Sequence, residues 1–106
     1  MTLKKLSIML TAAAVLSTPM AFAAGDAAAG KAKSALCVSC HGAEGKAPIM
    51  PTYPKIGGQN AGYIVDALKA YKAGQRTSAQ AGMMAGMAAP LSDADIDNLA
   101  AYFSSL

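Results

Sequence analysis

The chain has 106 residues with 10 Gly, 5 Pro, 2 Cys, 1 His and no Trp, a length that allows one small domain. The formal net charge is +3, and Lys4 and Lys5 supply two of these charges. The remaining excess of one positive charge is too small for the basic stripe of a nucleic-acid-binding protein or for a polybasic membrane-surface segment.

The N-terminal segment has the pattern of an export signal. Lys4 and Lys5 precede an uncharged run from Leu6 to Thr18, and Ala21-Phe22-Ala23 forms a small-x-small cleavage site. We therefore expect residues 1–23 to be a cleaved signal peptide and residues 24–106 to be the mature domain, located in the periplasm. The run is short for a bilayer span, which needs ~20 residues. No transmembrane segment is expected in the mature chain, and a retained anchor is the alternative.

The mature sequence is poor in large apolar side chains. Outside the leader it has 20 Ala but only 20 larger apolar residues, aromatic ones included. A core of this size rarely supplies more than ~3–5 kcal/mol, so a disulfide, a metal or a covalent cofactor is expected to stabilise the fold.

The first helical pattern begins with Asp26 as N-cap and extends to about Cys40, with Gly30 inside it. A glycine within a helix costs about 1 kcal/mol relative to alanine and often marks the close approach of another element. The next segment, residues 41–59, is rich in Gly and Pro and is expected to be a loop.

Two further helical patterns follow. One begins near Asn60 and ends before Gly74, which suits the position after a helix C-cap. The other begins at Ser92, with Asp95 completing a capping box, and carries an apolar stripe. Residues 75–91 between them are expected to be a second long loop. No alternating strand pattern occurs, so the predicted class is all-α with three main helices. The stripe consists of Ile96, Leu99, Ala100, Phe103 and Leu106.

Residues 37–41 read C-V-S-C-H, the attachment motif of c-type haem. Two cysteines three residues apart near a helix end can reach both vinyl groups on one porphyrin edge. His41 can then turn its imidazole under the iron. We therefore predict one covalent haem c, with Cys37 and Cys40 forming the thioethers and His41 binding the iron. The three main helices would wrap around this haem.

Other uses of this motif fit less well. A thioredoxin-like C-x-x-C expects a βαβ context, which the pattern lacks. A zinc site needs four ligands, whereas Cys37, Cys40 and His41 are the only Cys and His residues of the chain. A disulfide across so short a loop would stabilise little.

The sixth iron ligand decides the class of function. A methionine there gives a closed electron-transfer centre with a raised potential, whereas an open site would favour ligand binding or catalysis. Met50 lies too soon after His41 to reach the opposite face of the haem. Met83, Met84 and Met87 follow the second helix and are better placed, although methionine also serves as a flexible filler of apolar cores.

The sequence resembles the class I c-type cytochromes, close to single domains of the bacterial cytochrome c4 and cytochrome c553 type. The resemblance spans residues 24–106. It rests on the C-V-S-C-H-G motif together with the segments Pro51–Pro54, Lys55–Gln59, Tyr63–Ile64, Lys72–Arg76, Met83–Ala88, Leu91–Ile96 and Leu99–Phe103.

The resemblance implies roles for further residues. The axial methionine of this family stands eight residues before the Ser that begins the last helix, which implies Met84, with Met87 and then Met83 as alternatives. A proline carbonyl accepts the Nδ1–H of the haem-ligating histidine, and Pro51 is the best match, with Pro48 and Pro54 as alternatives. The terminal helices cross at a glycine–aromatic contact, here Gly30 with Tyr102 or Phe103.

Three functions follow, in order of preference. The first is a periplasmic electron carrier, not an enzyme, whose haem has His/Met ligation and exchanges electrons with partner proteins of a respiratory or periplasmic chain. The second is a haem c relay subunit of a larger periplasmic oxidoreductase, such as a flavocytochrome. The third is a ligand-binding haem protein with an open sixth site.

Overall fold

Helices make up the secondary structure of this protein. The computed structural model describes residues 25–106, and no β-strand occurs in that range. The all-α prediction is confirmed, with five α-helices instead of the three main ones expected, while the predicted leader, residues 1–23, lies outside the described residues. The elements are α1 (Ala27–Lys33), α2 (Ala35–His41), the 3-10 helix η1 (Ala43–Gly45), α3 (Ala61–Lys72), α4 (Ala81–Ala88) and α5 (Asp93–Ser104).

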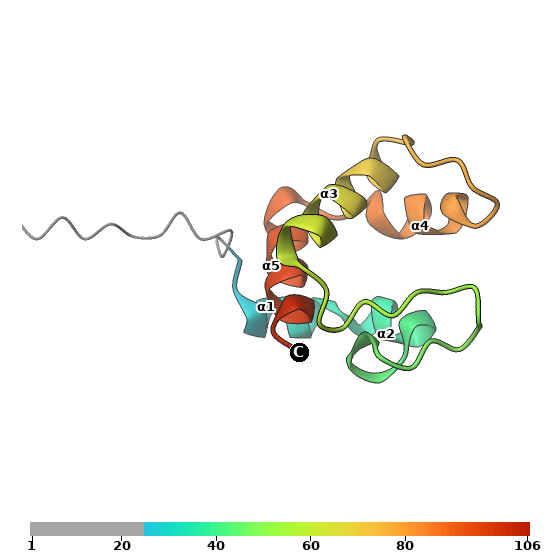
Figure 1. Cartoon of the computed structure of the whole chain (residues 1–106). Helices are drawn as coiled ribbons and strands as arrows, with labels where there is room; N and C mark the ends of the chain where they lie inside the picture. Colours follow the sequence, from blue (N-terminus) through green and yellow to red (C-terminus); the bar gives the residue numbers. More distant parts are fainter. Residues whose placement is uncertain (1–24) are drawn as a thin grey trace, which may run out of the picture.

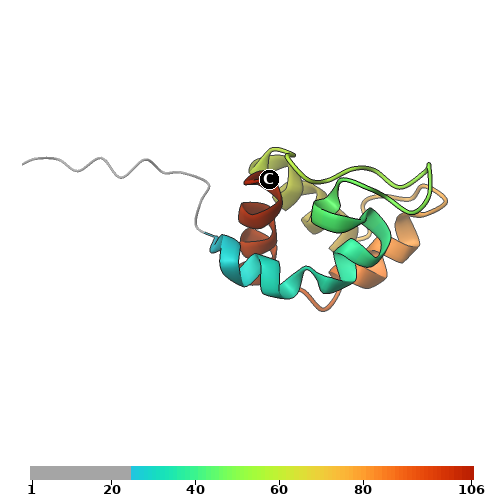
Figure 2. The same ribbon diagram turned by 90° about the horizontal axis from the view of Figure 1, so that it is seen from below.

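The helices form two walls joined at one side. Figure 1 shows α3 and α4 facing α2 and the 46–58 loop, with α1 and α5 at the closed side. Seen from below, the elements run in a ring (Figure 2). The main helix contacts are α1 with α5, α3 with α5, and α3 with α4. This arrangement leaves α2 and α4, which carry the predicted haem ligands, on opposite walls.

The crossing of α1 and α5 closes the ring. A Cβ atom added at Gly30 would overlap the Asn98 carbonyl and lie 2.9 Å from the Tyr102 Cβ, so only glycine allows this approach. The backbone N–H of Asp26 donates to Oδ1 of Asn98 (2.8 Å), while the Asp26 carboxylate caps α1. The predicted glycine–aromatic contact is confirmed, with Tyr102 as the aromatic partner.

The single helix predicted from Asp26 to about Cys40 is wrong, because the chain breaks at Ser34. The Ser34 hydroxyl donates to the carbonyl of Lys31 (2.7 Å), and the Ser34 N–H binds the same carbonyl (3.2 Å). Such local bonds compete with the regular helix ladder. The break lets α2 take its own direction, which turns the C-x-x-C-H segment toward the opposite wall.

The expectation of a loop throughout residues 75–91 is also wrong, because α4 forms within it. Gly82 and Gly86 suggested a loop, but alanine and methionine, which have high helix propensity, fill the positions between them. Ala81 and Ala88 are fully buried, and α4 packs mainly against α3. This burial offsets the cost of the two glycines.

Helix α3 has the bounds that the sequence predicts. It begins after Asn60, and Gly74 follows its C-cap with a left-handed φ of 70°. The Asn60 side chain makes no capping bond. Instead, the Asn60 N–H is bound by the Gln59 side-chain oxygen (2.8 Å).

The last helix, α5, begins at the predicted capping box. The Ser92 hydroxyl accepts from the N–H of Asp95, and the Asp95 carboxylate accepts from the N–H of Ser92, both at 3.0 Å. The bond from the Ser92 backbone lowers the pKa of Asp95. From the apolar stripe of α5, Leu99, Ala100 and Phe103 then pack with Ile64 of α3, and Ile96 is buried as well.

Within residues 25–106, every helix is too short or too polar to cross a lipid bilayer.

We predict that Gly30→Ala destabilises the folded protein by at least about 2 kcal/mol, because the new methyl group would meet backbone atoms that cannot move aside. Gly62→Ala in α3 is the matched control, since nothing lies within 4 Å of its added Cβ. It should leave stability unchanged or raise it slightly. Thermal unfolding followed by circular dichroism measures both, and equal melting temperatures for the two variants would contradict the close crossing.

Candidate cofactor site

A cavity of about 510 Å³ lies between the two walls. Its lining includes the apolar side chains of Ile64 and Leu68 from α3 and of Leu99 and Phe103 from α5. Cavities of this size and character hold small molecules and cofactors. The inward faces of α3 and α5 therefore line this cavity as well as packing on each other.

The α2 wall presents the whole C-x-x-C-H motif to this cavity. Cys37, Cys40 and His41 stand at i, i+3 and i+4 of α2, so they share one helix face, and all three line the cavity. Both thiols are free and half-buried. Burial raises the pKa of Cys37, which keeps its thiol protonated. A thioredoxin-like nucleophile needs a lowered thiol pKa, so this environment argues against that use of the pair.

His41 is held in place by a bond on its far nitrogen. The side chain is buried, and its Nδ1 lies 2.7 Å from the carbonyl oxygen of Pro54. A carbonyl can only accept, so Nδ1 carries a proton, and in the neutral ring this tautomer leaves the lone pair on Nε2. Nε2 has no hydrogen-bond partner among the described residues. No side-chain nitrogen or oxygen in this part of the chain is both fully buried and unpartnered, so Nε2 must be accessible, and it faces the cavity that His41 lines.

The assignment of Pro51 as partner of the histidine is wrong, and Pro54, one of the two alternatives, makes the bond. Pro51 is exposed within a turn that the bond from the Tyr53 N–H to the Met50 carbonyl closes (3.1 Å). The chain returns toward His41 only after this turn. The spacing of the prolines from His41 in the sequence does not reveal this turn, so it cannot tell which proline carbonyl faces the histidine.

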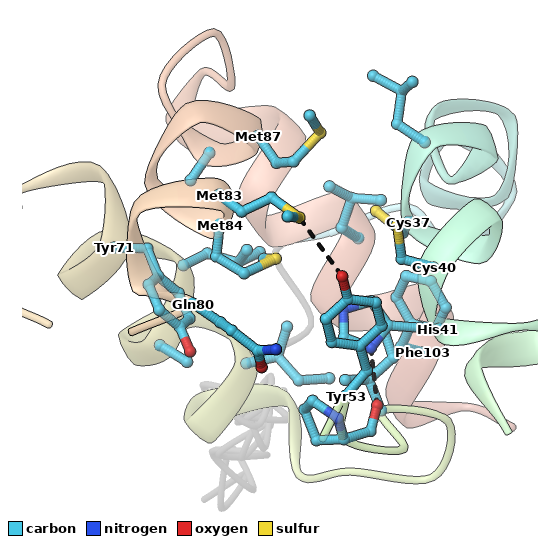
Figure 3. A pocket seen from close by; sticks show the side chains of 18 of the residues that line it. Cys37, Cys40, His41, Tyr53, Tyr71, Gln80, Met83, Met84, Met87 and Phe103 are labelled. Atoms are coloured by element: carbon cyan, nitrogen blue, oxygen red, sulfur yellow. Dashed lines mark hydrogen bonds between the residues drawn. The ribbon is translucent and has the colours of Figure 1, made fainter. Parts of the chain in front are cut away.

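The α4 wall presents three methionines. Met83, Met84 and Met87 line the cavity, and Figure 3 shows their side chains directed toward the wall that carries Cys37, Cys40 and His41. Met84 is the least exposed of the three, with Met83 and Met87 at 53% and 45%. At 100° per residue it also lies nearest to the buried side of α4, which Ala81 and Ala88 define. Met50 is exposed and does not line the cavity.

The groups around this cavity fit a haem. Two thiols and an imidazole face three thioethers across an apolar space, which provides attachment points on one wall and soft iron ligands on both. The charged residues of the lining, Lys33, Lys55 and Arg76, are all cations, which suits a cofactor that bears carboxylates. No cluster of three or more His, Cys, Asp or Glu able to hold a metal ion occurs in residues 25–106, so the zinc alternative has no support there.

Some lining residues were not found from the sequence. Arg76 donates to the hydroxyls of Tyr71 (3.0 Å) and Tyr63 (3.4 Å), and its guanidinium stacks 4.7 Å from the Tyr71 ring centre. These two bonds raise the pKa of Arg76. The signal in the sequence was the spacing of Tyr63 and Tyr71, which puts both on one face of α3. Nothing in the sequence pointed to Tyr53, Thr52 and Gln80, which also line the cavity.

Comparison with known proteins identifies relatives along nearly the whole described chain. The family model described as Cytochrome c matches residues 27–106. Cytochrome c-554(548) from Halomonas halodenitrificans is 50% identical over 82 residues, which cover 77% of this chain and 98% of that protein. A thiosulfate dehydrogenase electron acceptor from Thiomonas intermedia is 39% identical over 79 residues, covering 74% of this chain and 35% of that protein.

Cytochrome c4 is similar in both sequence and structure. The protein from Stutzerimonas stutzeri is 47% identical over 94 residues, which cover 83% of this chain and 44% of the relative. The crystal structure of reduced recombinant cytochrome c4 from Pseudomonas stutzeri matches with a TM-score of 0.66 at 44% identity, covering 77% of this chain and 46% of that one. This chain thus spans less than half the length of cytochrome c4.

The variant Cys37→Ala/Cys40→Ala should be mostly unfolded, because it cannot retain a covalent group in the cavity that the core residues line. Far-ultraviolet circular dichroism of the purified variant measures this, with the haem-loaded wild type as the folded reference. A cooperative melting transition from a helical state would show that the chain folds without the cofactor.

Proposed function

This chain belongs to the cytochrome c family, and on that premise we propose that it is a periplasmic electron-transfer protein whose single haem c is bound by His41 and Met84. The observation that carries the proposal is the meeting of the C-x-x-C-H face of α2 and the methionine face of α4 at one apolar cavity. Two walls with ligands of this kind suit a haem between them, with both axial positions filled.

Haem c, the covalent cofactor of this family, supplies one-electron chemistry by cycling between ferric and ferrous iron. The protein contributes attachment and orientation. Cys37 and Cys40 would hold one edge of the haem through thioether bonds, and Nε2 of the His41 imidazole would bind the iron. The Pro54 carbonyl fixes the His41 ring through Nδ1 (2.7 Å), which also makes the imidazole a stronger donor.

Met84 is the proposed sixth ligand. Its position nearest the buried side of α4 and its low exposure favour it over Met87 and Met83. A thioether ligand stabilises the ferrous state and so raises the reduction potential. With His41 and Met84 both on the iron, small external ligands would be excluded and no substrate would need to bind it.

The location and the partners are proposed on the same basis. The leader pattern of residues 1–23 would direct the chain out of the cytoplasm. This fits a c-type haem, which is attached outside the cytoplasm. Partners would be redox proteins of a respiratory or periplasmic electron-transfer chain. Encounters of this kind bury little surface, often less than ~1,200 Å².

The first test is an optical spectrum of the protein produced with haem-maturation machinery, recorded oxidised, reduced, and reduced under carbon monoxide. The wild type should show the far-red band of methionine sulfur on ferric iron and should not bind carbon monoxide. Met84→Ala should lose the band and bind carbon monoxide, because the sixth position becomes open. Met50→Ala is the matched control and should behave as the wild type, since Met50 does not line the cavity.

Two results would count against this ligation. A band that survives in Met84→Ala and disappears in Met87→Ala would transfer the role to Met87. A wild type without the band that binds carbon monoxide readily would mean an open sixth site, and the protein would then be a ligand-binding haem protein.

A second function is favoured by the relative named as a thiosulfate dehydrogenase electron acceptor, in which the matched region is 35% of a longer protein. A domain of this kind can serve as the haem c relay of a larger periplasmic oxidoreductase, such as a flavocytochrome. Light scattering of the protein purified gently from its own host distinguishes the two. A monomer supports the free carrier, and a stable complex with a flavoprotein or another oxidoreductase supports the relay subunit.

A further inference from the structure

We propose that Thr52 and Tyr53 are positioning residues that fasten the α4 wall to the opposite loop and so control access of external ligands to the sixth coordination position. This inference rests on the proposed His41/Met84 ligation. The two contacts that join the walls, Tyr53 with Met83 and Thr52 with Gln80, are called the clasp below.

The clasp consists of two hydrogen bonds between sequence-distant segments. The Tyr53 hydroxyl donates to the sulfur of Met83 (3.6 Å), as Figure 3 shows, and the Gln80 side-chain amide donates to the Thr52 hydroxyl (3.0 Å). The partners are 30 and 28 residues apart in the chain. On the α4 side, Gln80 is the N-cap residue and Met83 lies in the first turn of the helix, which begins at Ala81.

The loop side of the clasp is firmly held. The N–H of Ile49 donates to the Cys40 carbonyl (3.0 Å), and the N–H of Ile56 donates to the Gly45 carbonyl (2.8 Å). Between these anchors, Pro54 accepts the bond from His41, and the Tyr53 ring lies 6.4 Å from the His41 ring, centre to centre. The consecutive residues 52–54 therefore contact both the histidine and the methionine helix.

The α4 side of the clasp has no side-chain cap on its helix. Gln80, the N-cap residue of α4, makes no side-chain capping bond, because its amide is directed to Thr52. The connection from Gly74 to Gln80 is exposed, whereas Ala81, the first residue of the helix, is buried, and its N–H donates to the Ser78 carbonyl (2.9 Å). An uncapped first turn is prone to fray. The clasp therefore restrains the turn that immediately precedes Met84.

This geometry predicts a specific consequence. For an external ligand to replace Met84, the first turn of α4 must move away from the cavity, and that movement breaks both clasp bonds. Removing the bonds in advance makes this opening easier. A hydrogen bond of this type changes an equilibrium by roughly two- to fivefold when water competes for the same groups, so loss of both should change it about tenfold.

The test is the binding of imidazole to the ferric, haem-loaded protein, followed by the disappearance of the far-red band. Tyr53→Phe and Thr52→Val each remove one clasp bond with little change of shape. Each should raise the imidazole association constant roughly two- to fivefold, and the double variant about tenfold. Thr52→Ser keeps the hydroxyl and should bind imidazole as the wild type does.

Tyr102→Phe is the matched control for removal of a tyrosine hydroxyl. Tyr102 lies in α5 at the crossing with α1, and its hydroxyl makes no hydrogen bond within the described residues. Its imidazole affinity should equal that of the wild type. The midpoint of unfolding in denaturant is measured for every variant, so that general loosening of the fold is separated from opening at α4.

A double-mutant cycle tests whether Tyr53 acts through Met83. Met83→Leu should raise imidazole affinity as much as Tyr53→Phe does, and adding Tyr53→Phe to Met83→Leu should cause no further rise. Met83→Leu should retain the far-red band. If it loses the band, Met83 is the iron ligand, and the proposed ligation by Met84 is wrong.

The clasp is overturned if the far-red band is present and the double variant Thr52→Val/Tyr53→Phe binds imidazole as weakly as the wild type. It is also overturned if Tyr102→Phe raises the imidazole association constant by the same factor, or if Thr52→Ser does not keep the wild-type affinity for imidazole. A wild type without the far-red band would refute the proposed ligation, and the clasp with it. These results distinguish a failure of the clasp from a failure of the proposed function.

Discussion

The fold depends on one constraint, which is that residues 25–106 contain too few large apolar side chains to fill the interior. Phe103 and Leu99 of α5 lie in the hydrophobic core and also line the cavity. The packing of α3 on α5 is therefore only part of the core. A planar apolar group between the walls would complete it, which explains why small residues such as Gly30, Ala81 and Ala88 suffice where helices approach closely.

The ligand set follows from the same constraint. A haem c held between the walls would be part of the core, so the residues proposed to bind it come from elements that also form its walls. On α2 this needs only one short segment, since the spacing of Cys37, Cys40 and His41 directs all three to one side. The opposite wall is built from a separate helix whose position depends on α3. The two proposed ligand groups are thus positioned by different contacts, and the Pro54 carbonyl connects the histidine to the loop between them.

The features that sequence analysis predicted correctly are those that depend on neighbouring residues. The capping box of Ser92 and Asp95, the glycine after α3 and the shared face of the C-x-x-C-H motif are all local. The break at Ser34 is local too, but the sequence does not show it. A serine within a helical pattern looks like any other helix position unless its hydroxyl bond to the Lys31 carbonyl is known. Helix α4 was missed because its stability comes from packing against α3, which overrides the two glycines. The partner of His41 and the contacts of Tyr53 depend on how a turn folds through space, and residue spacing does not encode that.

The contact between Asp26 and Asn98 joins residues 72 positions apart. Its formation closes almost the whole described chain into one loop, and the entropy lost in closing a loop grows only slowly with its length. Contacts of such large sequence separation slow folding, because the chain loses the entropy of closing the loop before the stabilising contacts within it have formed. Apart from Leu99 and Phe103 of α5, the residues that line the cavity lie between those ends. The search that brings the terminal helices together therefore also determines when the ring around the cofactor becomes complete.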